Sequence, residues 1–243
     1  MSDTNEMSGT SEQRRQFLKT SVGAAAVAIA PGMLMFDMAH GKTEAVSGKV
    51  RWGMLINTAN CADCDKCVKA CNKENGLSGG LSPTDSQWIR KVELKDLRTG
   101  RSLALPMMCQ HCAEPPCVDV CPTGASFKRA DGIVLVDKHI CIGCRYCMMA
   151  CPYKARSFVH EPLHDQKPDV PRGKGVVESC TMCVQRVDVG KIPACAEACP
   201  NKSILFGNLN DPNSEISNKM RTEASTQVRA DLGLDTGLRY QGI

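Results

Sequence analysis

The stretch Cys141-Ile142-Gly143-Cys144-Arg145-Tyr146-Cys147-Met148-Met149-Ala150-Cys151-Pro152 decides the fold, because two, two and three residues separate its four cysteines. Three cysteines two residues apart can wrap one metal cluster in a tight loop. The fourth lies one helical turn beyond the third and points away, so it must serve a second cluster. This spacing, followed by proline, is typical of ligands to [4Fe-4S] clusters.

Similar motifs occur four times and use all 16 cysteines of the 243-residue chain. The motifs hold, in order, Cys61, Cys64, Cys67 and Cys71; Cys109, Cys112, Cys117 and Cys121; Cys141, Cys144, Cys147 and Cys151; and Cys180, Cys183, Cys195 and Cys199. Proline follows the last cysteine of the second, third and fourth motifs, where it ends a helix and turns the chain. In the first motif Asn72 takes the place of this proline. The difference predicts another kind of turn there but not the loss of a ligand.

Other uses of cysteine fit these spacings less well. A four-cysteine zinc site needs two separated Cys-x2-Cys pairs, which only the fourth motif resembles. Cysteines two residues apart in one loop rarely meet disulfide geometry. A c-type haem site needs histidine directly after such a pair, and a redox dithiol needs only one pair. His111 and His139 are assigned structural roles, because four cysteines already satisfy a cluster.

The segments around the motifs predict an α+β fold. Apolar runs at 50–56, 103–108 and 133–136 precede the first three motifs and predict strands, and short helices are expected to carry the last cysteines. Charged stretches at 90–101 and 167–174 are interpreted as solvated loops, with docking of a partner as the alternative.

Three local signals predict turns or caps. Asp131-Gly132 is typical of a hairpin turn, and Gly143 allows backbone N–H groups to come close to cluster sulfur. A turn at 210–212 precedes a helix expected to be capped near Asn213 or Ser214.

The amino terminus is similar to a twin-arginine export signal. Arg14-Arg15-Gln16-Phe17-Leu18-Lys19 precedes a small apolar stretch at 22–35, which is shorter than the roughly 20 residues that a membrane span needs. The alternative is a chance amphipathic start of a cytosolic helix. We expect 1–40 to direct export of the folded protein to the periplasm. No clear Ala-x-Ala site precedes Gly41, so a signal retained as a membrane anchor stays open.

The charge balance argues against nucleic acid as a partner. The formal net charge of +4 counts every cysteine as a neutral thiol. A cubane cluster with four thiolates carries about two negative charges, so four clusters reverse the sign. Aromatic residues make up only 4% of the chain, so bound clusters are expected to help hold the fold together.

Over roughly residues 50–215 the chain resembles the four-cluster ferredoxin subunits of complex iron–sulfur molybdoenzymes, the NrfC/DmsB-type family. The stretches at 117–127 (CVDVCPTGASF) and 206–216 (FGNLNDPNSEI) are similar to exported NrfC-type subunits. The stretch at 141–159 (CIGCRYCMMACPYKARSFV) is most similar to the DsrO-type subunit of the DsrMKJOP membrane complex, which is linked to dissimilatory sulfite reductase. We favour the DsrO-type assignment.

The resemblance implies two pseudo-symmetric ferredoxin-like modules, each holding two [4Fe-4S] clusters, with loop insertions. Module A would comprise 50–72 and 175–215, module B would be 103–159 inserted within it, and 216–243 would form a carboxyl-terminal tail. Carried over by position, the ligand sets are Cys61, Cys64, Cys67 and Cys199 (set one); Cys71, Cys180, Cys183 and Cys195 (set two); Cys109, Cys112, Cys117 and Cys151 (set three); and Cys121, Cys141, Cys144 and Cys147 (set four). Every set is complete, so none is forced to be a three-iron site.

The resemblance also implies a function, that of a non-catalytic electron-transfer subunit. Its expected partners are an NrfD-type integral membrane subunit that reacts with quinone, a multihaem cytochrome c and other subunits of a membrane redox complex. Electrons would pass between the quinone pool and dissimilatory sulfur metabolism. The alternative is the ferredoxin subunit of a formate-dependent nitrite, tetrathionate or polysulfide reductase. A cluster used as a Lewis acid would leave one iron short of a cysteine, and no motif is short.

Overall fold

A computed structural model describes residues 46–61, 64–77, 84–100, 102–164 and 166–243, and the predicted export signal at 1–40 lies outside them. The strands are β1 (Trp52–Asn57), β2 (Ile89–Lys95), β3 (Ser102–Met108), β4 (Ser126–Lys128), β5 (Val134–Val136), β6 (Arg156–Phe158), β7 (Val177–Ser179), β8 (Ile204–Asn208) and β9 (Leu238–Gln241). The helices are α2 (Lys66–Asn75), α3 (Pro116–Asp119), α4 (Tyr146–Ala150), α5 (Val184–Val187), α6 (Ala194–Glu197) and α7 (Glu215–Thr222), with a 3-10 helix η1 (Ala230–Leu232). This is an α+β fold, as predicted.

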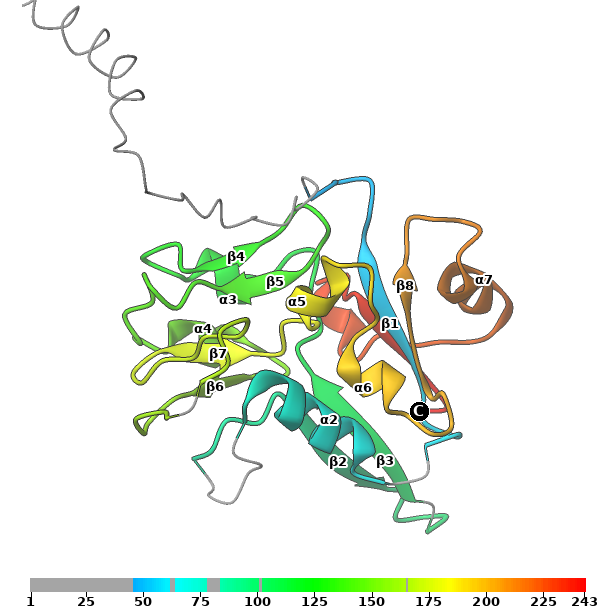
Figure 1. Cartoon of the computed structure of the whole chain (residues 1–243). Coiled ribbons are helices and arrows are strands. Elements are labelled where there is room, and N and C mark those ends of the chain that lie inside the picture. Colours follow the sequence, from blue (N-terminus) through cyan, green and yellow to red (C-terminus); the bar gives the residue numbers. More distant parts are fainter. Residues whose placement is uncertain (1–45, 62–63, 78–83, 101, 165) are drawn as a thin grey trace, which may run out of the picture. The chain divides into compact units, whose positions relative to one another are not determined.

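A three-stranded sheet joins segments that are far apart in the sequence (Figure 1). The predicted strand β1 pairs antiparallel with β8, with Trp52 opposite Asn208 and Ile56 opposite Ile204. On its other side β1 pairs in parallel with β9, where Met54 lies opposite Leu238. The residues before the first cysteine motif are therefore held beside those after the fourth.

The hairpin of β2 and β3 corrects one sequence interpretation. Ile89 lies opposite Met108 and Lys95 lies opposite Ser102, so the first half of the stretch at 90–101 is a strand and not a solvated loop. Val92 lies among the charged side chains of β2 and packs against the core. A strand at the surface can be this polar because only one of its faces is buried.

Two shorter hairpins complete the sheets. β4 and β5 pair antiparallel around Gly132, whose φ of +85° shows that the predicted hairpin turn is right. β6 pairs with β7, with Phe158 opposite Val177, so this hairpin crosses the boundary drawn between the predicted modules at 103–159 and 175–215. The described residues belong to one compact unit, and the division into two pseudo-symmetric modules stays a prediction.

The segment 216–243 is part of the core and more than a tail. Ser214 caps α7, as predicted, by accepting a hydrogen bond from the Ser217 N–H at 3.2 Å. Strand β9 was not expected, yet Leu238 and Tyr240 are completely buried in it. The Tyr240 hydroxyl donates to the carbonyl oxygen of Pro106 at 3.2 Å, which ties the end of the chain to β3.

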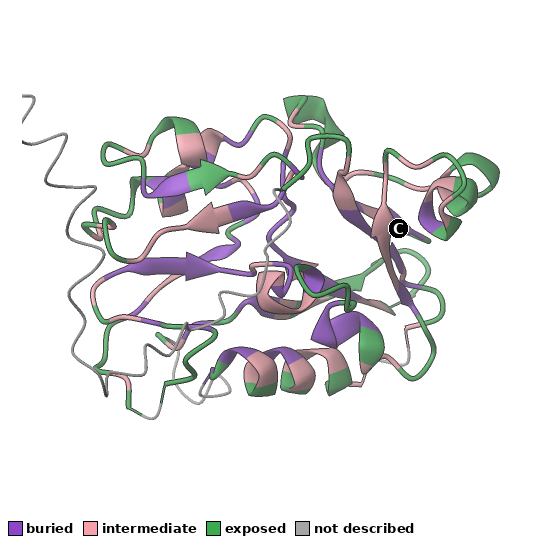
Figure 2. Cartoon of the chain, turned by 45° about the horizontal axis from the view of Figure 1, so that its top comes forward, coloured by how far each residue is buried: buried purple, intermediate pink, exposed green. Residues whose placement is uncertain are grey.

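Cysteine thiols take up much of the interior that aromatic side chains fill in other proteins. The main core cluster combines Met54, Ile56, Trp88 and Tyr240 with seven of the cysteines, six of which are buried. Figure 2 shows how the buried segments are distributed over the fold. Within the described part of the chain, no helix is both long enough and apolar enough to cross a membrane.

Candidate iron–sulfur centres

Four short helices position the third cysteine of each motif. Cys67, Cys117, Cys147 and Cys195 lie in α2, α3, α4 and α6. In the last three helices the chain leaves the helix before the fourth cysteine, which proline then follows. Helix α2 instead continues past Cys71 and Asn72 to Asn75, where Gly76 ends it with a φ of +64°. The different turn predicted at Asn72 is therefore wrong: without proline, the helix simply runs on for another turn.

Set one comes together from the two distant parts of the sequence that β1 and β8 join. Its four thiols line one small cavity with Ile56, Pro106 and Pro200. Burial raises the pKa of Cys67 to about 11, with further contributions from the neighbouring thiols of Cys61, Cys199 and Cys64. All four cysteines are half-buried.

Set two is assembled from α2, the loop before α5, and α6, and all four of its cysteines are buried. Burial raises the pKa of Cys71 to about 12, and the charge of Cys183 adds to the effect. Burial also raises the pKa of Cys180, with Cys71, Cys195 and Cys183 contributing in that order. The four thiols thus act on one another at close range.

Set three is also completely buried. Burial raises the pKa of Cys112 to about 12, and the charges of Cys109, Cys117 and Cys151 contribute. Cys151 belongs to the third motif while the other three belong to the second. The structure therefore brings a fourth cysteine of one motif to the first three of another, as the resemblance implies.

Set four lines a second small cavity, and it is the most exposed of the sets. Cys121, Cys141, Cys144 and Cys147 surround this cavity, and Cys144 is exposed. Gly143 between them has a φ of +69°, and a Cβ atom there would lie 2.1 Å from the carbonyl oxygen of Gly175. The need for glycine thus comes from the close packing of two backbone segments.

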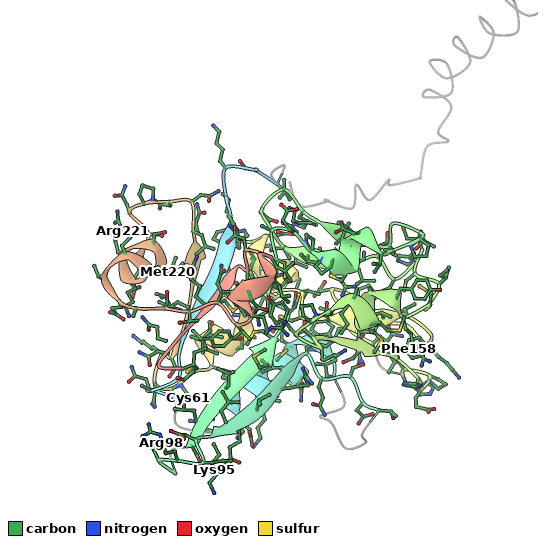
Figure 3. The ribbon with its side chains drawn as sticks, turned by 180° about the vertical axis from the view of Figure 1, so that it is seen from behind. Cys61, Lys95, Arg98, Phe158, Met220 and Arg221 are labelled. Carbon is green, nitrogen blue, oxygen red and sulfur yellow. The ribbon has the colours of Figure 1, made fainter. Side chains whose placement is uncertain are left out.

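The four sets follow one another in a row. Cys67 of set one raises the pKa of Cys195 in set two, after burial and the nearer thiols of its own set. Cys109 of set three likewise raises the pKa of Cys180 in set two. Cys147 of set four raises that of Cys117 in set three. Neighbouring sets therefore approach each other in the order one, two, three, four. Figure 3 labels Cys61 of set one and Phe158 beside set four on opposite sides of the view.

Each set has a thiol that accepts a hydrogen bond. Backbone N–H groups of Ser203, Met182 and Ser126 donate to Cys199, Cys180 and Cys121 at 3.3, 3.4 and 3.3 Å. The Asn75 amide donates to Cys71 at 3.5 Å, and the Arg156 guanidinium donates to Cys117 at 3.1 Å. Donors of this kind stabilise thiolates and help set the potential of a bound cluster.

His111 has a structural contact of the kind expected from the sequence. Its Nδ1 accepts a hydrogen bond from the Val134 N–H at 3.0 Å, and the residue is buried with a φ of 44°. Burial, and then the nearby charge of Arg156, lower the pKa of His111 to about 3, so the imidazole is neutral at physiological pH. It links the second motif to β5.

The donors of each thiol set suit a cluster, because a cubane takes four thiolates, one for each iron. Among the described residues, no three Cys, His, Asp or Glu side chains converge tightly enough to bind one metal ion. A zinc ion draws all its thiolates to about 2.3 Å from one centre. In a cubane each thiolate binds a different iron, so the sulfurs stand further apart. The four thiol sets therefore fit [4Fe-4S] clusters.

Sequence reasoning missed Asn75 and Arg156, the two side chains other than cysteine that donate to sulfur with nitrogen in the described part of the chain. A comparison of the repeats contains the signal for Arg156. It lies five residues after Cys151, where Ser126 lies five residues after Cys121, and both residues begin a strand. The change from serine to arginine at equivalent places in two repeats is the signal that the sequence offers.

Comparisons with known proteins agree with these sites. Residues 101–209 match the model of a 4Fe-4S dicluster domain. The chain is 42% identical to the Hdr-like menaquinol oxidoreductase iron-sulfur subunit 1 of Archaeoglobus fulgidus, over 93% of this chain and 97% of that protein. It is 40% identical to protein NrfC of Escherichia coli, over 90% and 91% of the two chains. It is 33% identical to a tetrathionate reductase subunit of Salmonella typhimurium, over 95% and 88%. The chain thus belongs to the NrfC/DmsB-type family of iron–sulfur proteins, and its cofactors are [4Fe-4S] clusters, for which its sixteen cysteines provide ligands enough for four.

Proposed function

We propose that this protein relays single electrons along a row of four clusters, held by sets one, two, three and four in that order. Thiols of sets one, two and three pack in the main core cluster, and thiols of sets three and four pack together in a second cluster. This continuous row of thiol sets is the observation that carries the proposal. A [4Fe-4S] cluster bound to such a set takes up and releases one electron while its protein ligands stay in place. No bond is made or broken, so the protein needs no catalytic group.

The burial of the thiol sets indicates that the row runs from one surface of the protein to another. Sets two and three are completely buried, which keeps water and small oxidants away from the middle of the row. At the two ends of the row, every cysteine of sets one and four except Cys147 is half-buried or exposed. Set four has exposed apolar side chains beside it, Ile142 and Met149, each 66% exposed. Electrons would therefore enter and leave at the ends of the row.

We propose that the protein is a DsrO-type subunit and that it works on the outer face of the cytoplasmic membrane. Its partners would be an NrfD-type membrane subunit and a multihaem cytochrome c, which link the quinone pool to dissimilatory sulfur metabolism. The stretch at 141–159 supports this, as does the relative whose name is that of a menaquinol oxidoreductase subunit. Export would follow the twin-arginine signal at 1–40, cleaved or retained as an anchor.

A second candidate is the ferredoxin subunit of a nitrite, tetrathionate or polysulfide reductase. The similarity to NrfC and to a tetrathionate reductase subunit favours it. Purification from native membranes separates the two candidates. We expect an NrfD-type subunit and a haem-staining cytochrome to purify with the protein. A catalytic nitrite or tetrathionate reductase subunit in their place would favour the alternative.

Iron and sulfide analysis of the full chain, with low-temperature EPR of the reduced protein, tests the relay itself. Four clusters correspond to about sixteen irons and about sixteen labile sulfides for each chain. Fewer than four reducible clusters would contradict the assignment of the thiol sets. Export is tested by replacing Arg14 and Arg15 with lysine and fractionating the cells: the proposal expects the protein to stay in the cytoplasm.

A further inference from the structure

Arg156 is a buried cation beside the thiols of set three. It begins β6, and only 5% of the residue is exposed. Its Nη2 donates to the sulfur of Cys117 at 3.1 Å. The guanidinium is charged at every relevant pH, so the protein places a permanent positive charge at this position.

The same side chain also acts on set four. After burial, the groups that perturb the Arg156 pKa are three thiols, in the order Cys117, Cys109 and Cys147. Cys117 and Cys109 belong to set three, and Cys147 belongs to set four. Cys117 and Cys147 also pack in one small core cluster, so the guanidinium that donates to Cys117 lies where the two sets meet.

No carboxylate balances this charge in the part of the chain that the structure describes. Arg156 forms no ion pair there, and its buried Nη1 has no hydrogen-bond partner. An unpaired buried guanidinium is unfavourable in a protein interior. Two bound clusters, each negatively charged with its thiolates, would supply the missing countercharge from both sides.

Set two has a different electrostatic environment. Arg186 lies near Cys183, but it forms ion pairs with Glu74 at 3.3 Å and with Glu197. The remaining side-chain donor at this set, Asn75, is neutral. At the position of the repeat that corresponds to Arg156, Ser126 is neutral too. Among the described residues, a buried guanidinium without an ion pair therefore lies at the junction of sets three and four and not beside set two. Arg145, which lines the set four cavity, is exposed and lies over the ring of Phe158.

We propose that Arg156 is a shared tuning residue, which raises the reduction potentials of the clusters of sets three and four together. This inference rests on the proposed four-cluster relay. Each reduction adds one negative charge to a cluster, and a fixed positive charge in a low-dielectric interior favours that reduced state. Raising both potentials would favour electrons at the end of the row that contains the exposed Cys144.

The test is an EPR-monitored redox titration of the full chain with Arg156→Gln and Arg156→Lys. For Arg156→Gln we expect the reduction equilibrium constants of two clusters to fall about tenfold, or 59 mV for a one-electron couple, and the other two to stay unchanged. Arg156→Lys keeps the charge, so its shift should be clearly smaller. Arg221→Gln on α7 is the control for the loss of one positive charge, because the Arg221 guanidinium donates to Pro212 and Asn218, away from the thiol sets (Figure 3).

Unchanged potentials in an Arg156→Gln protein that holds all four clusters would overturn the inference. If the Arg156→Gln protein does not bind all four clusters, a second measurement tests the proposal. For it, the arginine side chains of the protein are labelled with 15N. Pulsed EPR of the reduced wild type should then detect a nitrogen coupled to a cluster, and Arg156→Lys should lose that coupling. Absence of the coupling in the wild type would overturn the proposal. Iron content is measured on the same samples, so failure of the relay itself would appear as missing clusters and not as unshifted potentials.

Discussion

The inner and outer thiol sets are built from the same motifs but lie in different surroundings. In sets two and three every cysteine is buried, whereas in sets one and four seven of eight are half-buried or exposed. Burial of a ligand makes its cluster part of the core, because cluster binding and packing then stabilise the same residues. An exposed ligand leaves its cluster close to solvent and to partners. From this difference we expect the inner clusters to contribute most to the stability of the fold and the outer clusters to be the ones that exchange electrons with other proteins.

The largest effect is expected for Cys180→Ser in set two. Cys180 packs in the main core cluster, and the loss of the set two cluster would leave a hollow lined by the remaining buried thiols. We expect little soluble protein and the loss of more than about four irons from any that remains. Soluble yield and iron content are the measurements. A well-folded protein with three intact clusters would show that the inner sets are no more structural than the outer ones.

Asn72→Pro tests how the first motif differs from the others. It introduces the proline that follows the other fourth cysteines, but at a position inside α2. Proline in a helix interior costs about 3 kcal/mol. Denaturant unfolding should show a loss of this size, together with weaker retention of the set two cluster that Cys71 serves. Asn72→Ala keeps the helix and is the control, with a change below about 1 kcal/mol. Equal stability of the two variants would mean that the last turn of α2 contributes nothing.

Gly143→Ala tests what constrains an outer set. Both Gly143 and Gly124 have positive φ, at +69° and +68°, but only Gly143 has the carbonyl of Gly175 where a Cβ would lie. A strained φ alone costs roughly 1–3 kcal/mol, so Gly124→Ala should show a loss of about this size and Gly143→Ala a larger one. Thermal unfolding and the EPR intensity of the set four cluster measure both. Equal losses of stability in the two variants would show that the close packing at Gly143 adds nothing to the cost of the substitution.

The smallest effect on stability is expected for Cys144→Ser. Cys144 is the exposed member of set four, so its replacement leaves the main core untouched. The variant should stay folded, with an unfolding temperature within a few degrees of the wild type. It should lose or alter one cluster, which lowers the iron content by about four or less. If it behaved like Cys180→Ser, the contrast between inner and outer sets would be broken.

The sequence predicted the parts of the fold that depend on local spacing. The strands before the first three motifs, the turn at Gly132 and the cap at Ser214 all follow from neighbouring residues. The short helices expected to carry the last cysteines are present, but only α2 includes a fourth cysteine, and the other three helices end before it. The meeting of Cys61 and Cys199 could be stated only through resemblance, because local spacing carries no information on which distant motif completes a set.

Other features could not be predicted because they depend on tertiary packing. β9 is a four-residue strand recognisable only once β1 lies beside it, and β2 is polar enough to be interpreted as a loop. The role proposed for Arg156 depends on the approach of two thiol sets, each of which draws on two motifs. An arginine in a charged chain gives no local sign that it will be buried.

The pairing of β1 with β8 also affects how the protein is made. Cys67 and Cys199 lie 132 positions apart, and a ribosome adding about 5–20 residues per second needs roughly 7–26 seconds to pass from one to the other. During that time the early thiols of set one await their last ligand, and set two awaits Cys180, Cys183 and Cys195. Set three and set four, by contrast, are complete once Cys151 has been synthesised. Cofactor insertion can therefore begin in the middle of the chain and can finish only after almost the whole polypeptide has been translated.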